Sequence, residues 1–227
     1  MKYFQDKITQ RLRVRFARGL ELAFISHLDL MRFWERVLRR AGLPLSYTQG
    51  FSPHPRISLA APLALGVTSE AEIMDIYLSR WISPHNFIQS LRRQLPPGIQ
   101  VHEANTVPPD IPSLQSQVRY AEYMLVVERE GGPEDVSSAL QHLMATKSLM
   151  WQHIRDTGIR SYDLRALIDK LWLVSCNHSD AVIGMRLRCG PSGAGRPEQV
   201  IAALGFPGLP HSIHRNKLIL EAPRGKL

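Results

Sequence analysis

The chain has 227 residues, and with 44% hydrophobic and 21% charged residues it is not a predominantly disordered protein. Its formal net charge is +8. Its two cysteines, Cys176 and Cys189, lie outside any C-x-x-C pair. This cysteine pattern excludes a disulfide framework, a cysteine-based zinc site and a self-contained iron–sulfur cluster. No apolar run is long enough to span a membrane and the charged N-terminus lacks an apolar signal region, so we expect a cytoplasmic protein.

The first predicted element is a strand over residues 11–18. Arginines alternate there with apolar residues, and this period of two is typical of a half-buried strand. We therefore expect Arg11, Arg13 and Arg15 to share a cationic outer face.

A helix that ends near Ala41 is predicted next. Ser26 and Asp29 have the spacing of a capping box, which fixes the start of this helix. At 100° per residue the helix divides into an apolar face and an opposite basic face. The basic face carries Arg32, Arg36, Arg39 and Arg40.

The remaining predicted elements of the first half are four strands and one helix. They are strands over 45–47, 57–64 and 71–78, a helix over 83–95 and a strand over 99–103. Apart from the short strand over 45–47, the order is strand, helix, two strands, helix, strand, which is that of a ferredoxin-like βαββαβ unit.

The second half is predicted to repeat this order. The repeat consists of strands over 118–128, 162–173, 181–188 and 211–220 and helices over 133–144 and 196–204. We therefore expect an α+β protein with two tandem ferredoxin-like units and antiparallel sheets, formed by residues 1–107 and 118–227 and joined by a proline-rich linker over 108–117. The alternative is a single α+β domain with another strand order.

Basic residues are concentrated at the two ends of the chain. Residues 1–60 contain 11 Lys and Arg against 4 Asp and Glu, and residues 186–227 contain 7 against 2. Of the 28 basic residues, 22 are arginine, whose planar guanidinium binds phosphate in a bidentate manner. This pattern favours a nucleic-acid partner, although arginine can also serve simply as a solvated cation.

Two histidines are candidates for phosphate binding or proton transfer. His27 lies in the first helical turn, where backbone N–H groups favour an anion, and the alternative for it is a packing role. His54 lies between Pro53 and Pro55, so it is held in place before a ligand arrives, and the alternative is an exposed histidine in a rigid turn. We expect both histidines to share one phosphate pocket with Ser26 and Arg56.

A glycine-rich loop over 190–195 precedes the last predicted helix, with Arg196 at its mouth. Such loops cradle phosphates, but this one fits neither common nucleotide-binding pattern, so a plain flexible loop is the alternative. No spacing of His, Cys, Asp or Glu indicates a metal site, and we expect no metal and no cofactor.

Four segments resemble, in this order, the bacterial radical SAM-linked protein family. They are Phe24–Leu30, Leu38–Pro44, Gly50–Ser58 and Pro62–Glu70, and the later segments Asp163–Ile168 and Gly195–Pro197 also resemble that family. The resemblance implies a partner, a radical SAM protein with a cobalamin-binding-type region. It also implies that the radical chemistry belongs to the partner, because this chain lacks the C-x-x-x-C-x-x-C cluster motif.

The sequence thus predicts an accessory RNA-binding protein that works with a radical SAM enzyme in RNA modification or processing, without catalytic activity of its own. The residues expected to bind phosphate are Arg11, Arg13, Arg15, Ser26, His27, Arg32, Arg36, Arg39, Arg40, His54, Arg56 and Arg196. One alternative is a metal-independent endoribonuclease that uses His27 or His54, since tandem ferredoxin-like units with a basic face resemble the RAMP-type endoribonucleases. Another is a protein-only adaptor that docks on an acidic partner.

Overall fold

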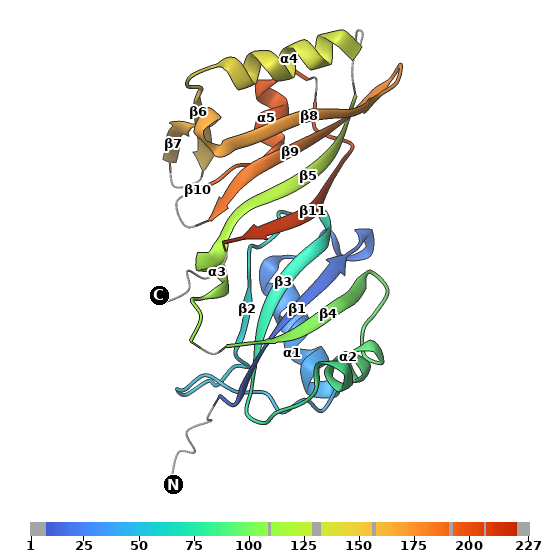
Figure 1. The fold of residues 1–227 in the computed structure, drawn as a ribbon, viewed down its shortest axis with the longest axis vertical. Coiled ribbons are helices and arrows are strands. Elements are labelled where there is room, and N and C mark those ends of the chain that lie inside the picture. The colour runs from blue at the N-terminus through green and yellow to red at the C-terminus, as the bar shows by residue number, and fades with distance from the viewer. Residues whose placement is uncertain are drawn as a thin grey trace. The chain divides into compact units, whose positions relative to one another are not determined.

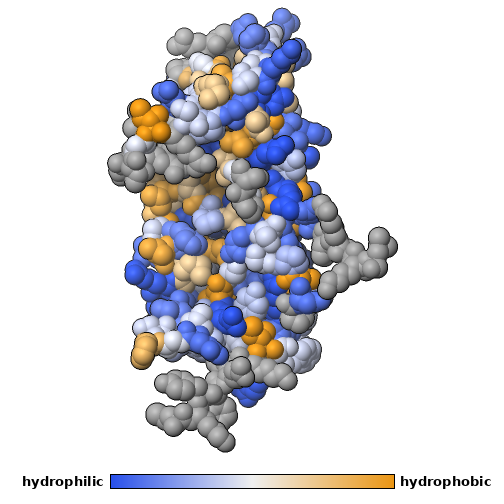
Figure 2. All heavy atoms as spheres, turned by 90° about the vertical axis from the view of Figure 1, so that its left-hand side faces the viewer, coloured by the Kyte–Doolittle hydropathy of each residue, from blue (hydrophilic) through white to orange (hydrophobic). Residues whose placement is uncertain are grey.

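The computed structural model describes residues 8–108, 110–128, 133–155, 158–190, 193–206 and 208–221. It has an α+β fold with mostly antiparallel strands (Figure 1). The described chain divides into two compact units, one that runs to Val118 and includes Glu221, and one formed by Arg119–Leu220. On the face drawn in Figure 2, hydrophobic residues lie in patches between hydrophilic ones.

The first unit follows the predicted order of elements. These are β1 (Gln10–Arg18), the short 3-10 helix η1 (Leu20–Leu22), α1 (His27–Arg40), β2 (Ile57–Leu59), β3 (Thr68–Leu78), α2 (Pro84–Arg92), β4 (Ile99–Val107) and α3 (Leu114–Gln117). The strands pair antiparallel in the order β2-β3-β1-β4. β1 is therefore an inner strand with a neighbour on each side.

Two predicted strands of this unit are shorter than expected. Residues 45–47 form only isolated bridges, from Leu45 to Leu78 and from Tyr47 to Pro55. β2 ends at Leu59, short of Pro62, which has no N–H to donate to a strand partner.

Both long helices of the first unit contribute to one hydrophobic core. Leu30, Trp34 and Leu38 of α1 are buried against β1, where the ring of Phe16 lies 4.9 Å from that of Trp34 in an edge-on arrangement. Phe87 and Leu91 of α2 belong to the same core. The predicted apolar face of α1 is confirmed.

The described residues of the second unit form ten elements. They are β5 (Val118–Glu128), α4 (Pro133–Ala145), β6 (Met150–Arg155), β7 (Gly158–Asp163), η2 (Arg165–Leu167), β8 (Ile168–Cys176), β9 (Asp180–Gly190), β10 (Gly193–Ala194), α5 (Pro197–Ala203) and β11 (Ser212–Leu220). β9 pairs antiparallel with β5, β8 and β10, and β11 lies beside β5. β6 and β7 form a separate hairpin.

The prediction of a single strand over residues 162–173 is wrong, because the chain turns after Asp163. Its Oδ1 accepts hydrogen bonds from the backbone N–H groups of Leu149 and Arg165, at 2.9 and 3.0 Å. The hydrogen bond from Leu149 is the largest of the causes that hold the pKa of Asp163 below its ordinary value. Aspartate side chains that bond nearby backbone in this way favour turns over strands.

A close approach between two strands fixes the residue type at position 184. Gly184 of β9 is paired with Trp172 of β8. The indole ring of Trp172 occupies the space that a Cβ atom at position 184 would take, so only glycine fits there without displacement of the ring.

None of the described helices is both long enough and apolar enough to cross a membrane.

Candidate functional site

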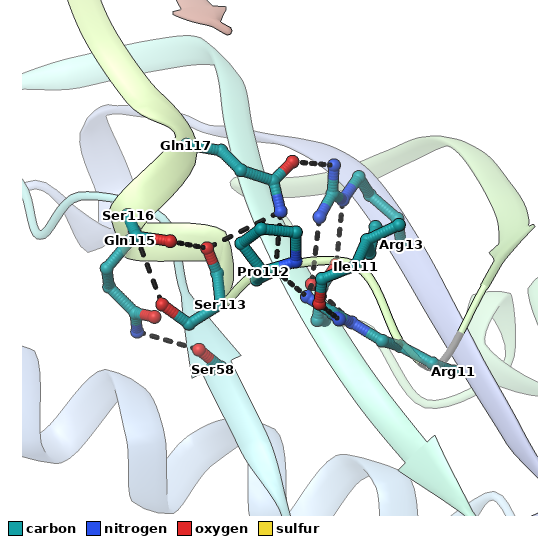
Figure 3. Close-up of polar contacts among 10 residues, drawn as sticks. Arg11, Arg13, Ser58, Ile111, Pro112, Ser113, Gln115, Ser116 and Gln117 are labelled. Carbon is teal, nitrogen blue, oxygen red and sulfur yellow. Dashed lines mark hydrogen bonds and ion pairs between the residues drawn. The ribbon is translucent and has the colours of Figure 1, made fainter. Parts of the chain in front are cut away.

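The arginines of β1 do not form the cationic outer face that the sequence predicts. Arg11 is 2% exposed, and its Nε and Nη2 donate to Oδ2 of the fully buried Asp75 at 2.9 and 2.6 Å. Its remaining N–H groups donate to the carbonyl oxygens of Ile111 and Pro112 (Figure 3). The expectation of a solvent-facing Arg11 is wrong, because Asp75 of β3 and the chain around Pro112 cover this part of the face.

Arg13 belongs to the same network. Its Nε and Nη2 donate to the two carboxylate oxygens of Asp75 at 2.9 and 3.0 Å, and its Nη1 donates to Oε1 of Gln117 at 3.1 Å (Figure 3). Arg15 is about half exposed and pairs with Glu103 at 3.3 Å. A phosphate would have to displace the contacts of Arg11 and Arg13, so these two arginines offer no free cationic surface, and of the predicted face Arg15 alone is accessible.

The arginines of α1 have the opposite environment. All four predicted members of the basic face, Arg32, Arg36, Arg39 and Arg40, are exposed to solvent. Arg32 and Arg39 make loose ion pairs of 3.4 Å with acidic residues one turn away on the same helix. Within the described part of the chain, Arg36 and Arg40 have no ion-pair partner.

The start of α1 is capped by Ser26 as predicted, with Asp29 bonded to the Ser26 hydroxyl and not to its backbone N–H. Oγ of Ser26 accepts a hydrogen bond from the backbone N–H of Asp29 and donates one to its carboxylate, at 3.1 and 2.7 Å. The hydroxyl of Ser26 is therefore engaged within the cap. His27 is exposed, so the alternative that it packs in the core is wrong.

The loop between Tyr47 and Arg56 is closed at its base by backbone contacts. The N–H of Thr48 donates to the carbonyl of His54 at 2.8 Å, and the N–H of His54 donates to Oγ1 of Thr48 at 3.0 Å. Gly50, with a φ of 127°, makes the turn, since side-chain-bearing residues rarely adopt this conformation. The rigid turn that the two prolines predict is present, and its outer residues 50–54 are exposed.

His54 contacts the middle of α1 and not its start. Its Nδ1 lies 3.6 Å from Oε1 of Glu35, whose other oxygen, Oε2, lies 3.4 Å from Arg39. Glu35 follows His27 by eight residues, a rise of about 12 Å along the helix axis. His54 thus contacts α1 about two turns beyond His27, and a phosphate pocket shared by the two histidines stays a prediction.

Arg56 also lies apart from the helix. Its guanidinium carbon is 5.9 Å from the centre of the Tyr77 ring, and that of Arg11 is 5.5 Å from the same centre. Because neighbouring residues of a strand point to opposite faces, Tyr77 shares the face of Asp75 and not that of the core residues Ile76 and Leu78. Arg56 thus lies on the face of the sheet that carries Asp75 and Tyr77, which is the face opposite α1.

These contacts define one candidate site, which we term the α1–loop surface. It consists of Arg32, Glu35, Arg36, Arg39 and Arg40 of α1 and of Phe51 and His54 of the loop. The sequence analysis missed Glu35 and Phe51. The spacing of Glu35 to Arg39 was a visible signal of an ion pair on the helix, but nothing in the sequence joined either residue to His54.

The second unit holds the remaining predicted site residue, Arg196. It is exposed at the N-cap of α5, and its carbonyl accepts from the backbone N–H groups of Gln199 and Val200. Residues 191 and 192 of the glycine-rich loop lie outside the described residues, so phosphate binding there stays a prediction.

A different arginine of this unit, Arg186, is held by acidic residues. It donates to Glu122 at 2.6 Å and lies 3.5 Å from Asp169. The hydrogen bond to Glu122 raises the pKa of Arg186 above its ordinary value. Across the described ranges of both units, no three His, Cys, Asp or Glu side chains gather as metal ligands would.

Comparison with known proteins identifies a family. A family model described as "uncharacterized protein conserved in bacteria (DUF2344)" matches residues 11–197. No curated protein matches the chain.

Two solved structures align with most of this chain. A chain of a Cbf5-Nop10-Gar1 complex aligns with a TM-score of 0.54 at 7% identity, over 91% of this chain and 48% of that one. A chain of the archaeal box H/ACA sRNP Nop10-Cbf5 complex aligns with a TM-score of 0.49 at 10% identity, over 94% and 50%. The chain thus spans about half the length of these two neighbours. At 7% identity the likeness to the chain of the Cbf5-Nop10-Gar1 complex concerns the fold alone.

Proposed function

We propose that this chain, which belongs to the family of uncharacterized proteins conserved in bacteria, is an RNA-binding protein whose α1–loop surface contacts the phosphate backbone. The observation that carries the proposal is the pair Arg36 and Arg40. They lie one turn apart on the exposed face of α1, and within the described residues no acidic side chain neutralises them. Guanidinium groups of this kind neutralise phosphates and displace counterions.

Other features of the first unit support the same partner. Arg32 and Arg39 add two exposed cations to the face, and each has only a loose ion pair that a phosphate can replace. The first 60 residues carry an excess of basic over acidic residues, which attracts a polyanion over a longer range.

We interpret each unit as ferredoxin-like, as the sequence predicts, with residues 108–117 as the linker. The first strand of each unit, β1 or β5, lies between the third and the fourth in the order expected for βαββαβ, with β6 and β7 as an insertion in the second unit. In the first unit this topology leaves the outer face of α1 to solvent. The likeness to the Cbf5-Nop10-Gar1 complex concerns this fold, whereas the RNA proposal rests on the surface.

The cooperation with a radical SAM enzyme is part of the proposal. It rests on the resemblance of the segments from Phe24 to Glu70 to the radical SAM-linked family. In this hypothesis the chain holds the RNA in the cytoplasm while its partner supplies the cluster and the radical chemistry.

The proposal is tested by the salt dependence of RNA binding. The double variant Arg36→Ala/Arg40→Ala is expected to bind all RNA sequences more weakly, and the slope of log K against log salt should flatten by roughly 1.4–1.8. The matched control, Arg92→Ala/Arg93→Ala, removes two exposed arginines of α2 and its C-cap and should change the slope less.

Equal changes in both double variants, or none in the first, would contradict the assignment to α1. If the wild-type protein binds no RNA at low salt, the adaptor hypothesis takes its place, in which the same arginines dock on an acidic protein.

One observation favours a second candidate function, metal-independent RNA cleavage at His54. A carboxylate beside an imidazole, as in the contact of Glu35 with His54, orients the ring for proton transfer. Cleavage that persists in a chelator, and that is lost in His54→Ala but kept in His27→Ala, would establish it.

A further inference from the structure

Phosphate binding does not explain the presence of Phe51 in the α1–loop surface. It is fully exposed at the outer end of the loop, and no other part of the described chain covers its ring. A phenylalanine ring that stays in water buries no apolar surface, so Phe51 does not stabilise the hydrophobic core.

The exposure of Phe51 is imposed by a well-defined loop. The paired backbone of Thr48 and His54 closes the loop below it, and Pro53 and Pro55 restrict the returning segment. The contact of His54 with Glu35 places the loop against α1. The loop that carries Phe51 is therefore closed at its base and held against α1 through His54.

The surroundings of the ring indicate which partner it meets. Its neighbours in the loop, residues 49–50 and 52–54, include no large apolar side chain, and the α1 residue that His54 contacts, Glu35, is charged. An apolar protein segment would need a wider hydrophobic patch. A nucleotide, in contrast, needs one aromatic face for its base and cations for its phosphates.

We propose that the α1–loop surface binds an unpaired segment of RNA, with one base stacked on Phe51 and the flanking phosphates on the arginines of α1. The bases of a duplex are already stacked on each other and cannot lie on a protein ring, whereas single strands and loops can. This inference rests on the proposed RNA binding and adds that the target is single-stranded.

The test compares Phe51→Ala with the wild-type protein on two probes, a pool of single-stranded RNA of random sequence and an RNA duplex of the same strand length. Phe51→Ala should weaken binding of the single strands by roughly 5- to 150-fold, the range seen when a stacking residue is truncated. Because the substitution removes no charge, the salt slope should stay unchanged. Phe51→Trp should retain the affinity.

The matched control is Phe24→Ala, which removes another exposed phenylalanine of the first unit, ahead of α1, and should leave single-strand affinity unchanged. The inference is overturned if Phe51→Ala binds single strands like the wild type, or if its affinity for the duplex falls equally. In either case a salt slope that depends on Arg36 and Arg40 leaves the proposed function standing, whereas absence of wild-type binding to both probes overturns both.

Discussion

The arginines of β1 and those of α1 have opposite roles, although both sets stand on a basic face in the sequence. Arg11 and Arg13 are held by the buried carboxylate of Asp75, while Arg36 and Arg40 lie in solvent without an ion-pair partner in the described chain. This difference shows that the position of an acidic partner determines whether a row of arginines has a structural role or can bind a ligand. A buried carboxylate converts arginines into structural elements, and its absence leaves them available to a ligand.

The β1 arginines gain several contacts that replace their lost hydration. Asp75 accepts hydrogen bonds from both guanidiniums, and the carbonyls of Ile111 and Pro112 with the side chain of Gln117 bind the remaining N–H groups. Burial of a charge is unfavourable unless such partners are complete. The network therefore ties the segment around Pro112 to β1.

The largest expected effect comes from removal of the shared carboxylate. Asp75→Ala should lower the free energy of unfolding by about 3–5 kcal/mol, because the buried guanidinium of Arg11 loses its counter-charge. Urea unfolding followed by circular dichroism measures the loss. Glu103→Ala breaks the exposed ion pair between Glu103 of β4 and Arg15 of β1, and it should lower the free energy of unfolding by less than about 1 kcal/mol. Similar losses in the two variants would remove the distinction between the buried and the exposed pairs.

A smaller loss is expected at the edge of the network. Gln117 is buried, and its side chain accepts a hydrogen bond from Arg13 and donates to the carbonyl of Pro112 at 2.6 Å. Gln117→Ala should lower the free energy of unfolding by about 1–3 kcal/mol, since buried groups are left unpaired. Gln115→Ala, on the exposed side of α3, should change it by less than about 0.5 kcal/mol. A cost of Gln117→Ala as small as that of Gln115→Ala would show that the network ends at Arg13.

The smallest effect on stability is expected on α1. Arg36→Ala/Arg40→Ala should change the free energy of unfolding by no more than about 0.5 kcal/mol per site, because both side chains are exposed and unpaired in the described structure. The same urea unfolding experiment measures this change. A loss as large as that of Gln117→Ala would mean that these arginines, too, are structural.

Local patterns in the sequence were sufficient for most elements of the first unit. The cap formed by Ser26 and Asp29 and the apolar stripe of α1 each lie within a few residues of chain, so their physics is visible in a short window. The alternation of β1 correctly indicated a strand.

Contacts between distant residues could not be predicted in this way. Asp75 is 64 positions from Arg11, and the carbonyls that complete the network are about 100 positions away, so the alternation assigned Arg11 to solvent. The contact of His54 with Glu35 likewise depends on how the loop returns to α1. In the second unit the side chain of Asp163 turned the backbone where the alternation alone predicted one continuous strand.

The close approach of Trp172 to Gly184 has a consequence for how this family can diverge. Because the indole ring fills the place of a Cβ atom at position 184, a substitution there is tolerated only when the ring is lost or moved at the same time. Among relatives the two positions should therefore change together, with glycine kept wherever the aromatic residue is kept. Such paired variation across β8 and β9 would record in evolution the register that the strands adopt in space.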